Sequence, residues 1–163
     1  MKKLALALCI LAIASGFAYA DHPEKQIGIG VVGGGGVMGG DIGLALKLPS
    51  MPIFWGVNLN LNSSGLGLRA TGDYYFIDEG LFAEDSFKLD WFLGLGGYLS
   101  LGLWSDGLHA GLGARAPVGL SWHITKEFEL WLDLAPSLGL GLSPLNFPEW
   151  NVAGELGFRM WLR

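Results

Sequence analysis

The sequence has little cysteine, little excess positive charge and few long apolar runs, and each shortage excludes a class of protein. Cys9 is the only cysteine among 163 residues, so it has no intrachain disulfide partner, and Leu8 precedes it where a lipoprotein signal needs a small residue. Lys and Arg number 10 against 15 Asp and Glu, which argues against nucleic acid as a partner. After the first 20 residues no apolar run approaches the ~18 that a membrane-spanning helix needs.

The N-terminus has the pattern of a secretory signal. Lys2 and Lys3 precede an apolar stretch from Leu4 to Phe17, and Ala18-Tyr19-Ala20 is a small-x-small cleavage site. The alternative, a retained membrane helix, requires ~20 apolar residues, and this stretch is too short. The sequence therefore predicts a signal peptide over residues 1–20 and a single exported domain over residues 21–163.

The exported part is unusually apolar for a chain without a spanning helix. Hydrophobic residues make up 51% of the sequence, and 27 residues are glycine. In lipid every backbone polar group needs an internal partner, and the structure other than a helix that provides one is a closed β-barrel. The composition therefore favours a transmembrane barrel.

Apolar and polar residues alternate with period 2 through most of this domain. In one segment Ile53, Trp55, Val57, Leu59 and Leu61 share one face, and Phe54, Gly56, Asn58, Asn60 and Asn62 share the other. Similar segments, about eight in all, cover residues 26–32, 41–48, 53–62, 66–76, 88–101, 108–124, 128–142 and 151–162. The pattern predicts an all-β fold, an eight-stranded antiparallel up-and-down transmembrane β-barrel with short connections, one of them over residues 78–86. Pro117 and Pro136 fall inside expected strands, which predicts either a shared bulge or a wrongly placed strand boundary.

Charged residues lie on the inward face of this pattern. An eight-stranded barrel is only wide enough for its own side chains, so inward charges are expected to pair and to close the lumen. Lys47 and Lys88 also face inward, and for these two a position in water at the barrel ends is the alternative. The predicted lumen charge network consists of Arg69, Asp73, Asp90, Arg115, Glu129, Asp133, Glu155 and Arg159.

Outward aromatic residues gather at one end of the expected barrel. If the N-terminus starts on the periplasmic side, these residues lie near the periplasmic interface, where amphipathic rings settle. The predicted periplasmic aromatic girdle consists of Trp55, Tyr74, Phe76, Trp91, Trp122, Phe128 and Phe158.

Several stretches resemble a widespread family of small uncharacterised outer-membrane barrels, of spirochaete type and related in shape to the OmpA and OmpX barrels. They are GLGARAPVGLSWHITKEFELWLDLAPSLGL, NVAGELGFRMWL, LGLRATGDYYF and WFLGLGGYLSLG. The resemblance implies an eight-stranded barrel of unassigned molecular function. The chain departs from the usual outer-membrane ending because its last residue, Arg163, is not aromatic.

Three motifs suggest chemistry, and each has a simpler structural interpretation. Gly28 to Gly33 match a dinucleotide fingerprint, but more glycines follow in place of a helix. Ser121, His123 and Glu129 share one inward face, as a nucleophile, base and orienting carboxylate do, but hydrogen bonding within the lumen is the favoured interpretation. His109 and His123 lie too far apart on one strand to share a metal.

The sequence thus predicts a bacterial outer-membrane protein of structural or surface-interaction type with a filled, non-conducting lumen. It is expected to be a monomer that is surrounded by outer-membrane lipid and inserted by the barrel-assembly machinery. No catalytic activity, cofactor or metal is expected, and the sequence identifies no surface ligand. Two alternatives stay open: a lipid-modifying outer-membrane barrel enzyme, and a soluble periplasmic lipocalin-like binding barrel.

Overall fold

The computed structural model describes residues 22–23, 25–36, 39–62, 64–84 and 87–162, and their strands form one antiparallel sheet. The expected signal peptide lies outside these residues, and so does Arg163. No helix in the described part is long and apolar enough to span a membrane. The strands are β1 (Ile27–Gly36), β2 (Gly39–Lys47), β3 (Phe54–Asn62), β4 (Gly65–Glu84), β5 (Phe87–Trp104), β6 (Gly107–Arg115), β7 (Val118–His123), β8 (Phe128–Ser143) and β9 (Leu145–Leu162).

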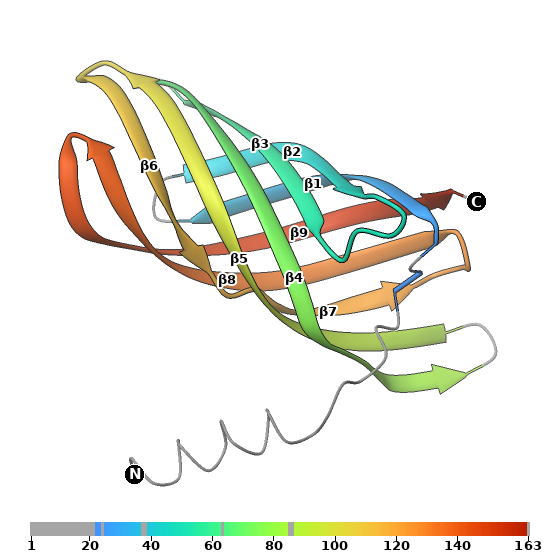
Figure 1. Ribbon diagram of the computed structural model, residues 1–163. Coiled ribbons are helices and arrows are strands. Elements are labelled where there is room, and N and C mark those ends of the chain that lie inside the picture. Colours follow the sequence, from blue (N-terminus) through green and yellow to red (C-terminus); the bar gives the residue numbers. More distant parts are fainter. Residues whose placement is uncertain (1–21, 24, 37–38, 63, 85–86, 163) are drawn as a thin grey trace, which may run out of the picture.

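The sheet closes on itself as a barrel (Figure 1). Except for β6 and β7, each strand pairs antiparallel with the next along the chain, and β1 pairs with β9 from Ile27↔Leu162 to Gly36↔Ala153. Strands β6 and β7 both lie between β5 and β8, so they are two parts of one barrel strand. The predicted eight-stranded up-and-down barrel is confirmed.

Pro117 causes the break between β6 and β7, because proline has no N–H to donate to a ladder. The register against β8 is the same on both sides of the break, from Arg115↔Ser137 to Val118↔Leu134. Ala116 N donates to Pro136 O at 3.0 Å, and Gly94 N donates to Pro117 O at 2.8 Å. The predicted shared bulge is therefore wrong: the strand loses ladder bonds here without shifting its register.

The hairpin of β4 and β5 is longer than the alternation predicts. The connection expected over residues 78–86 is wrong, because β4 continues to Glu84 and β5 begins at Phe87. Register shifts between Tyr75 and Ile77 and between Gly80 and Phe82 interrupt the period-2 pattern, which made this part of β4 look irregular in the sequence. The expected segments 26–32, 41–48 and 151–162 are likewise too short, since β1 continues to Gly36, β2 begins at Gly39 and β9 begins at Leu145.

The barrel is apolar outside and polar inside, the reverse of a soluble barrel. Large apolar side chains stay exposed on the outer surface, among them Ile42, Leu44, Val57, Leu61, Leu68, Leu95, Leu99, Leu101, Leu120, Leu132, Leu134 and Leu156. Most of the buried polar side chains line the lumen, among them Asn58, Thr71, Asp73, Asp90, Arg115, Ser121, Glu129, Asp133, Glu155 and Arg159. This distribution opposes the lipocalin-like alternative.

Aromatic rings fill the remaining space in the lumen, and glycines on neighbouring strands leave room for them. Trp131, Trp161 and Phe92 are buried. A Cβ added to Gly157 would lie 2.0 Å from Cζ2 of the Trp131 indole.

Substitution of Gly157 by alanine is expected to lower the free energy of unfolding by about 1–3 kcal/mol, because the new methyl group collides with Trp131. The measurement is the denaturant midpoint of the refolded barrel. Gly33→Ala is the matched control, since a Cβ on this exposed glycine of β1 meets nothing within 4 Å. Equal midpoints for the two variants would show that the packing of Trp131 does not need the space left by the missing side chain of Gly157.

Candidate functional site: the barrel lumen

The charged side chains of the lumen form layers between the two rims of the barrel. We call the end where β1 begins and β9 ends the terminal rim, and the end where β8 turns into β9 the opposite rim. One layer lies at mid-height and one near each rim. Taken together, the layers contain residues from six or more strands, so they exist only when the barrel is closed.

The mid-height layer is centred on Arg115 of β6. Its Nη1 and Nη2 donate to the two carboxylate oxygens of Glu155 on β9, both at 3.0 Å, and its Nε lies 3.3 Å from Asp73 on β4. This bidentate geometry is the strongest form of an arginine–carboxylate pair. Asp133 is the ladder partner of Glu155 on the neighbouring strand. The second carboxylate in direct contact with Arg115 is nevertheless that of Asp73.

The layer near the terminal rim is centred on Glu129 of β8. Arg159 Nη1 lies 3.1 and 3.0 Å from the two oxygens of Glu129, which also accept hydrogen bonds from Trp161 Nε1 at 2.8 Å and Ser121 Oγ at 2.9 Å. The Arg159 guanidinium lies over the Trp131 ring, 4.4 Å from its centroid. Stacking on aromatic faces suits guanidinium, so this cation is held by charge and by rings together.

His22 completes the terminal-rim layer from outside the sheet. Its backbone N donates to Asp78 Oδ2 at 3.1 Å, its Nδ1 lies 2.5 Å from the same oxygen, and its Nε2 lies 3.0 Å from Glu129 Oε1. The ring is buried against Phe54, with 5.1 Å between the centroids. His22 thus lies within the terminal rim.

His22 carries a proton more readily than an ordinary histidine. Burial by itself lowers the pKa of the imidazole, but the carboxylates of Glu129 and Asp78 outweigh that effect and raise the pKa to about 9. Neither His22 nor Asp78 was predicted from the sequence. His22 precedes the alternating segments, and Asp78 follows a bulge that breaks the alternation, so the pattern carries no signal for either residue.

Another residue of the predicted network, Asp90, also has partners. Asp90 lies 3.4 Å from Lys88 Nζ and 3.1 Å from His123 Nε2. Lys47 is only 5% exposed, which opposes the water-facing alternative, and its Nζ lies 5.7 Å from the centroid of the Phe54 ring. Lys47 is buried because the ring of Phe54, its ladder partner on β3, covers it.

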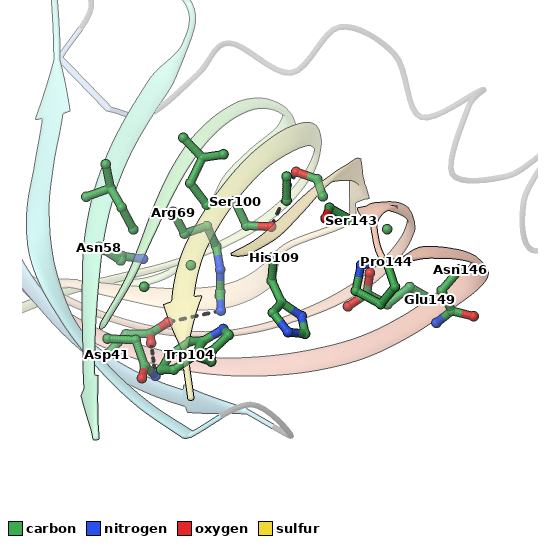
Figure 2. A pocket seen from close by; sticks show the side chains of 18 residues that line it. Asp41, Asn58, Arg69, Ser100, Trp104, His109, Ser143, Pro144, Asn146 and Glu149 are labelled. Carbon is green, nitrogen blue, oxygen red and sulfur yellow. Dashed lines mark hydrogen bonds and ion pairs between the residues drawn. The ribbon is translucent and has the colours of Figure 1, made fainter. Parts of the chain in front are cut away.

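Near the opposite rim the lumen opens into a cavity of about 280 Å³. Figure 2 shows Arg69 directed at Asp41, an ion pair of 3.2 Å, with the Trp104 and His109 rings in the same space. Asn60 Nδ2 donates to Asp41 Oδ1 at 2.8 Å. Charged and amide groups therefore form the floor of the cavity, and an aromatic ring forms part of its wall.

The aromatic side chains predicted to form a periplasmic girdle lie on the outer surface. Trp55, Tyr74, Phe76, Trp122, Phe128 and Phe158 are exposed, and Trp91 is half-buried. Two of them stack across β8 and β9, with 5.4 Å between the Phe128 and Phe158 centroids. Their contact with a membrane interface stays a prediction.

The motifs with possible chemistry are placed as follows. Residues 28–33 lie inside β1 and are followed by β2, without the helix of a dinucleotide site. Ser121 is fully buried and donates to Glu129, so the geometry provides no serine nucleophile held by a histidine base. His109 pairs with Asp106 at 3.1 Å beside the β5–β6 turn, at the other end of the barrel strand from His123.

No family model matches the sequence, and no curated protein does. Among solved structures, the N-terminal β-barrel domain of Pseudomonas aeruginosa OprF matches 85% of this chain and 98% of its own, with a TM-score of 0.57 and 14% identity. The Neisserial surface protein A (NspA) covers 83% of this chain and 94% of its own at 14% identity, with a TM-score of 0.39, too low to support an argument. At this identity the OprF likeness is one of fold. Membership of the family of small outer-membrane barrels stays a prediction.

Proposed function

We propose that the chain is an integral outer-membrane β-barrel protein whose filled lumen does not conduct, and that it acts structurally or through its surface. The observation that carries the proposal is the series of charged layers across the lumen, from Arg159 and Glu129 through Arg115 and Glu155 to Arg69 and Asp41. Buried, paired side chains leave no continuous water path, because an eight-stranded barrel is only just wide enough for them.

The outer surface supports the membrane part of the proposal. A contiguous band of exposed leucine, isoleucine and valine is far larger than the apolar patches that soluble monomers expose. Outer-membrane lipid is the partner that covers such a band on all sides, and a monomer then needs no protein partner there. Insertion by the barrel-assembly machinery belongs to the same proposal.

The surface role rests on the cavity at the opposite rim. If the N-terminus is periplasmic, this rim faces outside, and Trp104, Arg69 and Asp41 line the cavity that is then open to an external molecule. The lipid-modifying alternative has no comparable support, since Ser121 is buried at the terminal-rim end of the lumen and bonded to Glu129.

The purified protein is expected to produce no stable conductance steps in planar lipid bilayers. Heat-shift electrophoresis of the same protein in liposomes confirms that it has inserted as a folded barrel, so that absence of current does not reflect absence of protein. Large, stable single-channel steps from the unmodified barrel would refute the filled-lumen proposal and assign a porin function.

A further inference from the structure

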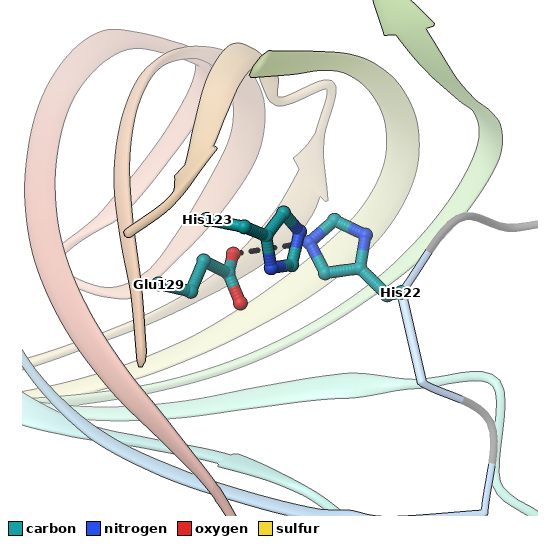
Figure 3. Close-up of side chains that lie close together, drawn as sticks. All are labelled: His22, His123 and Glu129. Carbon is teal, nitrogen blue, oxygen red and sulfur yellow. Dashed lines mark hydrogen bonds and ion pairs between the residues drawn. The ribbon is translucent and has the colours of Figure 1, made fainter. Parts of the chain in front are cut away.

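We propose that His22, His123 and Glu129 bind one divalent transition-metal ion, with Zn²⁺ as the ion their chemistry fits. One potential ligand atom from each residue lies within 4.8 Å of the other two (Figure 3). Two imidazoles and one carboxylate, with a further position open, form a common ligand set of zinc sites. The three residues come from the N-terminal segment, β7 and β8, so the site exists only when that segment occupies the terminal rim.

The spacing of one ligand pair already suits an ion. With bonds of about 2.0 Å, two ligands of tetrahedral zinc lie about 3.3 Å apart. His22 Nε2 and Glu129 Oε1 are 3.0 Å apart, so an ion can replace the proton between them with little movement. His123 then has to approach by a rotation of its side chain, which is 11% exposed at the end of β7.

Each of the two histidine rings also contacts an aspartate carboxylate, as is common for histidines in metal sites. Asp78 Oδ2 lies 2.5 Å from His22 Nδ1, which leaves Nε2 directed at Glu129. Asp90 Oδ2 lies 3.1 Å from His123 Nε2. These carboxylates orient the two rings and increase the basicity of the nitrogens that face the ion.

Unsatisfied buried oxygens supply an independent indication of a bound cation. Asp90 is 0% exposed and Asp78 is 1% exposed, and the Oδ1 atom of each has neither a hydrogen-bond nor an ion-pair partner among the described residues. Buried polar atoms without partners are costly. A cation bound close to these two carboxylates lowers that cost.

The charge balance at this rim also favours a cation. Asp78, Asp90 and Glu129 are buried carboxylates, whereas Arg159 and Lys88 are the permanent cations that contact them. Arg159 lies against Glu129 and Lys88 reaches Asp90, which leaves His22 as the basic group in contact with Asp78. A cation bound at His22 lies close to the Asp78 carboxylate, and the attraction between the two charges favours binding.

The test uses Zn²⁺ as the probe and the full chain, exported in a bacterial host and purified in detergent, in competition with a fluorescent chelator. We expect one Zn²⁺ per barrel, and a loss of affinity of about 100-fold or more in His22→Ala and in His123→Ala. His109→Ala is the matched control, because His109 is the one other histidine of the sequence and lies near the opposite rim, at the other end of the same barrel strand. Its affinity should equal that of the parent.

A second readout separates metal binding from a purely structural role. Zn²⁺ should slow tryptic cleavage after the exposed Lys25 in the parent but not in His123→Ala, because the ion ties the N-terminal segment to β7 and β8. Heat-shift electrophoresis establishes that each variant is a folded barrel; His22→Ala alters no strand. The proposal is overturned by absence of saturable Zn²⁺ binding to the folded parent, or by equal affinity in the parent, His22→Ala and His123→Ala.

Discussion

Replacement of Arg115 by alanine is expected to lower the free energy of unfolding by about 3–5 kcal/mol, the largest single effect in the lumen. The truncation leaves Glu155 and Asp73 buried with no direct cation, and the desolvation cost of both carboxylates then opposes folding. The measurement is the denaturant midpoint followed by heat-shift mobility. The same variant is expected to leak ions in planar bilayers, because it opens space between the two small cavities next to the layer.

Lys126→Ala is the control for Arg115→Ala. Lys126 lies exposed in the turn between β7 and β8, and removal of a surface cation changes stability by about 0.5 kcal/mol or less. A loss of stability no larger in Arg115→Ala than in Lys126→Ala would mean that the mid-height layer does not hold the barrel together. The filled-lumen proposal would then lose its main structural support.

Replacement of Leu134 by arginine is expected to cost about 2–4 kcal/mol, the penalty for a cation at the middle of a lipid-facing barrel surface. Leu134 lies near the centre of β8 and is 58% exposed on the apolar outer face. The penalty arises because lipid, unlike water, does not solvate guanidinium. The measurement is the folding equilibrium of the barrel in lipid vesicles.

Leu145→Arg is the matched control for Leu134→Arg. Leu145 begins β9 beside the hairpin turn at the opposite rim and is 79% exposed, so the same substitution should cost about 0–1 kcal/mol there. Equal costs at the two positions, together with recovery of the protein in the soluble periplasmic fraction, would show that the outer face does not meet lipid.

The alternation of side chains predicted which residues face the lumen along most of the barrel. Arg115, Glu129, Asp133, Glu155 and Arg159 are all buried on the side where the period of two placed them. The prediction succeeds because successive side chains of a strand point to opposite faces, whatever the strand pairs with. It fails on β4, where bulges shift the phase and bring Asp78 into the lumen.

Pairing within the lumen followed no sequence pattern. Arg115 meets Asp73, which lies on β4, because the strands tilt and the barrel closes, so side chains distant in the sheet become neighbours across a narrow bore. Proline interruptions likewise had two possible structural outcomes. The retained register around Pro117 depends on the ladders of β5 and β8 on either side, which the local sequence does not encode.

By itself the sequence determined the barrel, its approximate strand number and its apolar outer face, because these depend on a local period, on composition and on the need to pair every backbone group. The tertiary structure alone decided which charges pair and where the cavity lies. It alone also brought His22 to Glu129 and His123, because those contacts join segments with a sequence separation of 107 residues in one case. Such contacts are set by strand tilt, bulges and closure, which are properties of the whole barrel and leave no local mark in the chain.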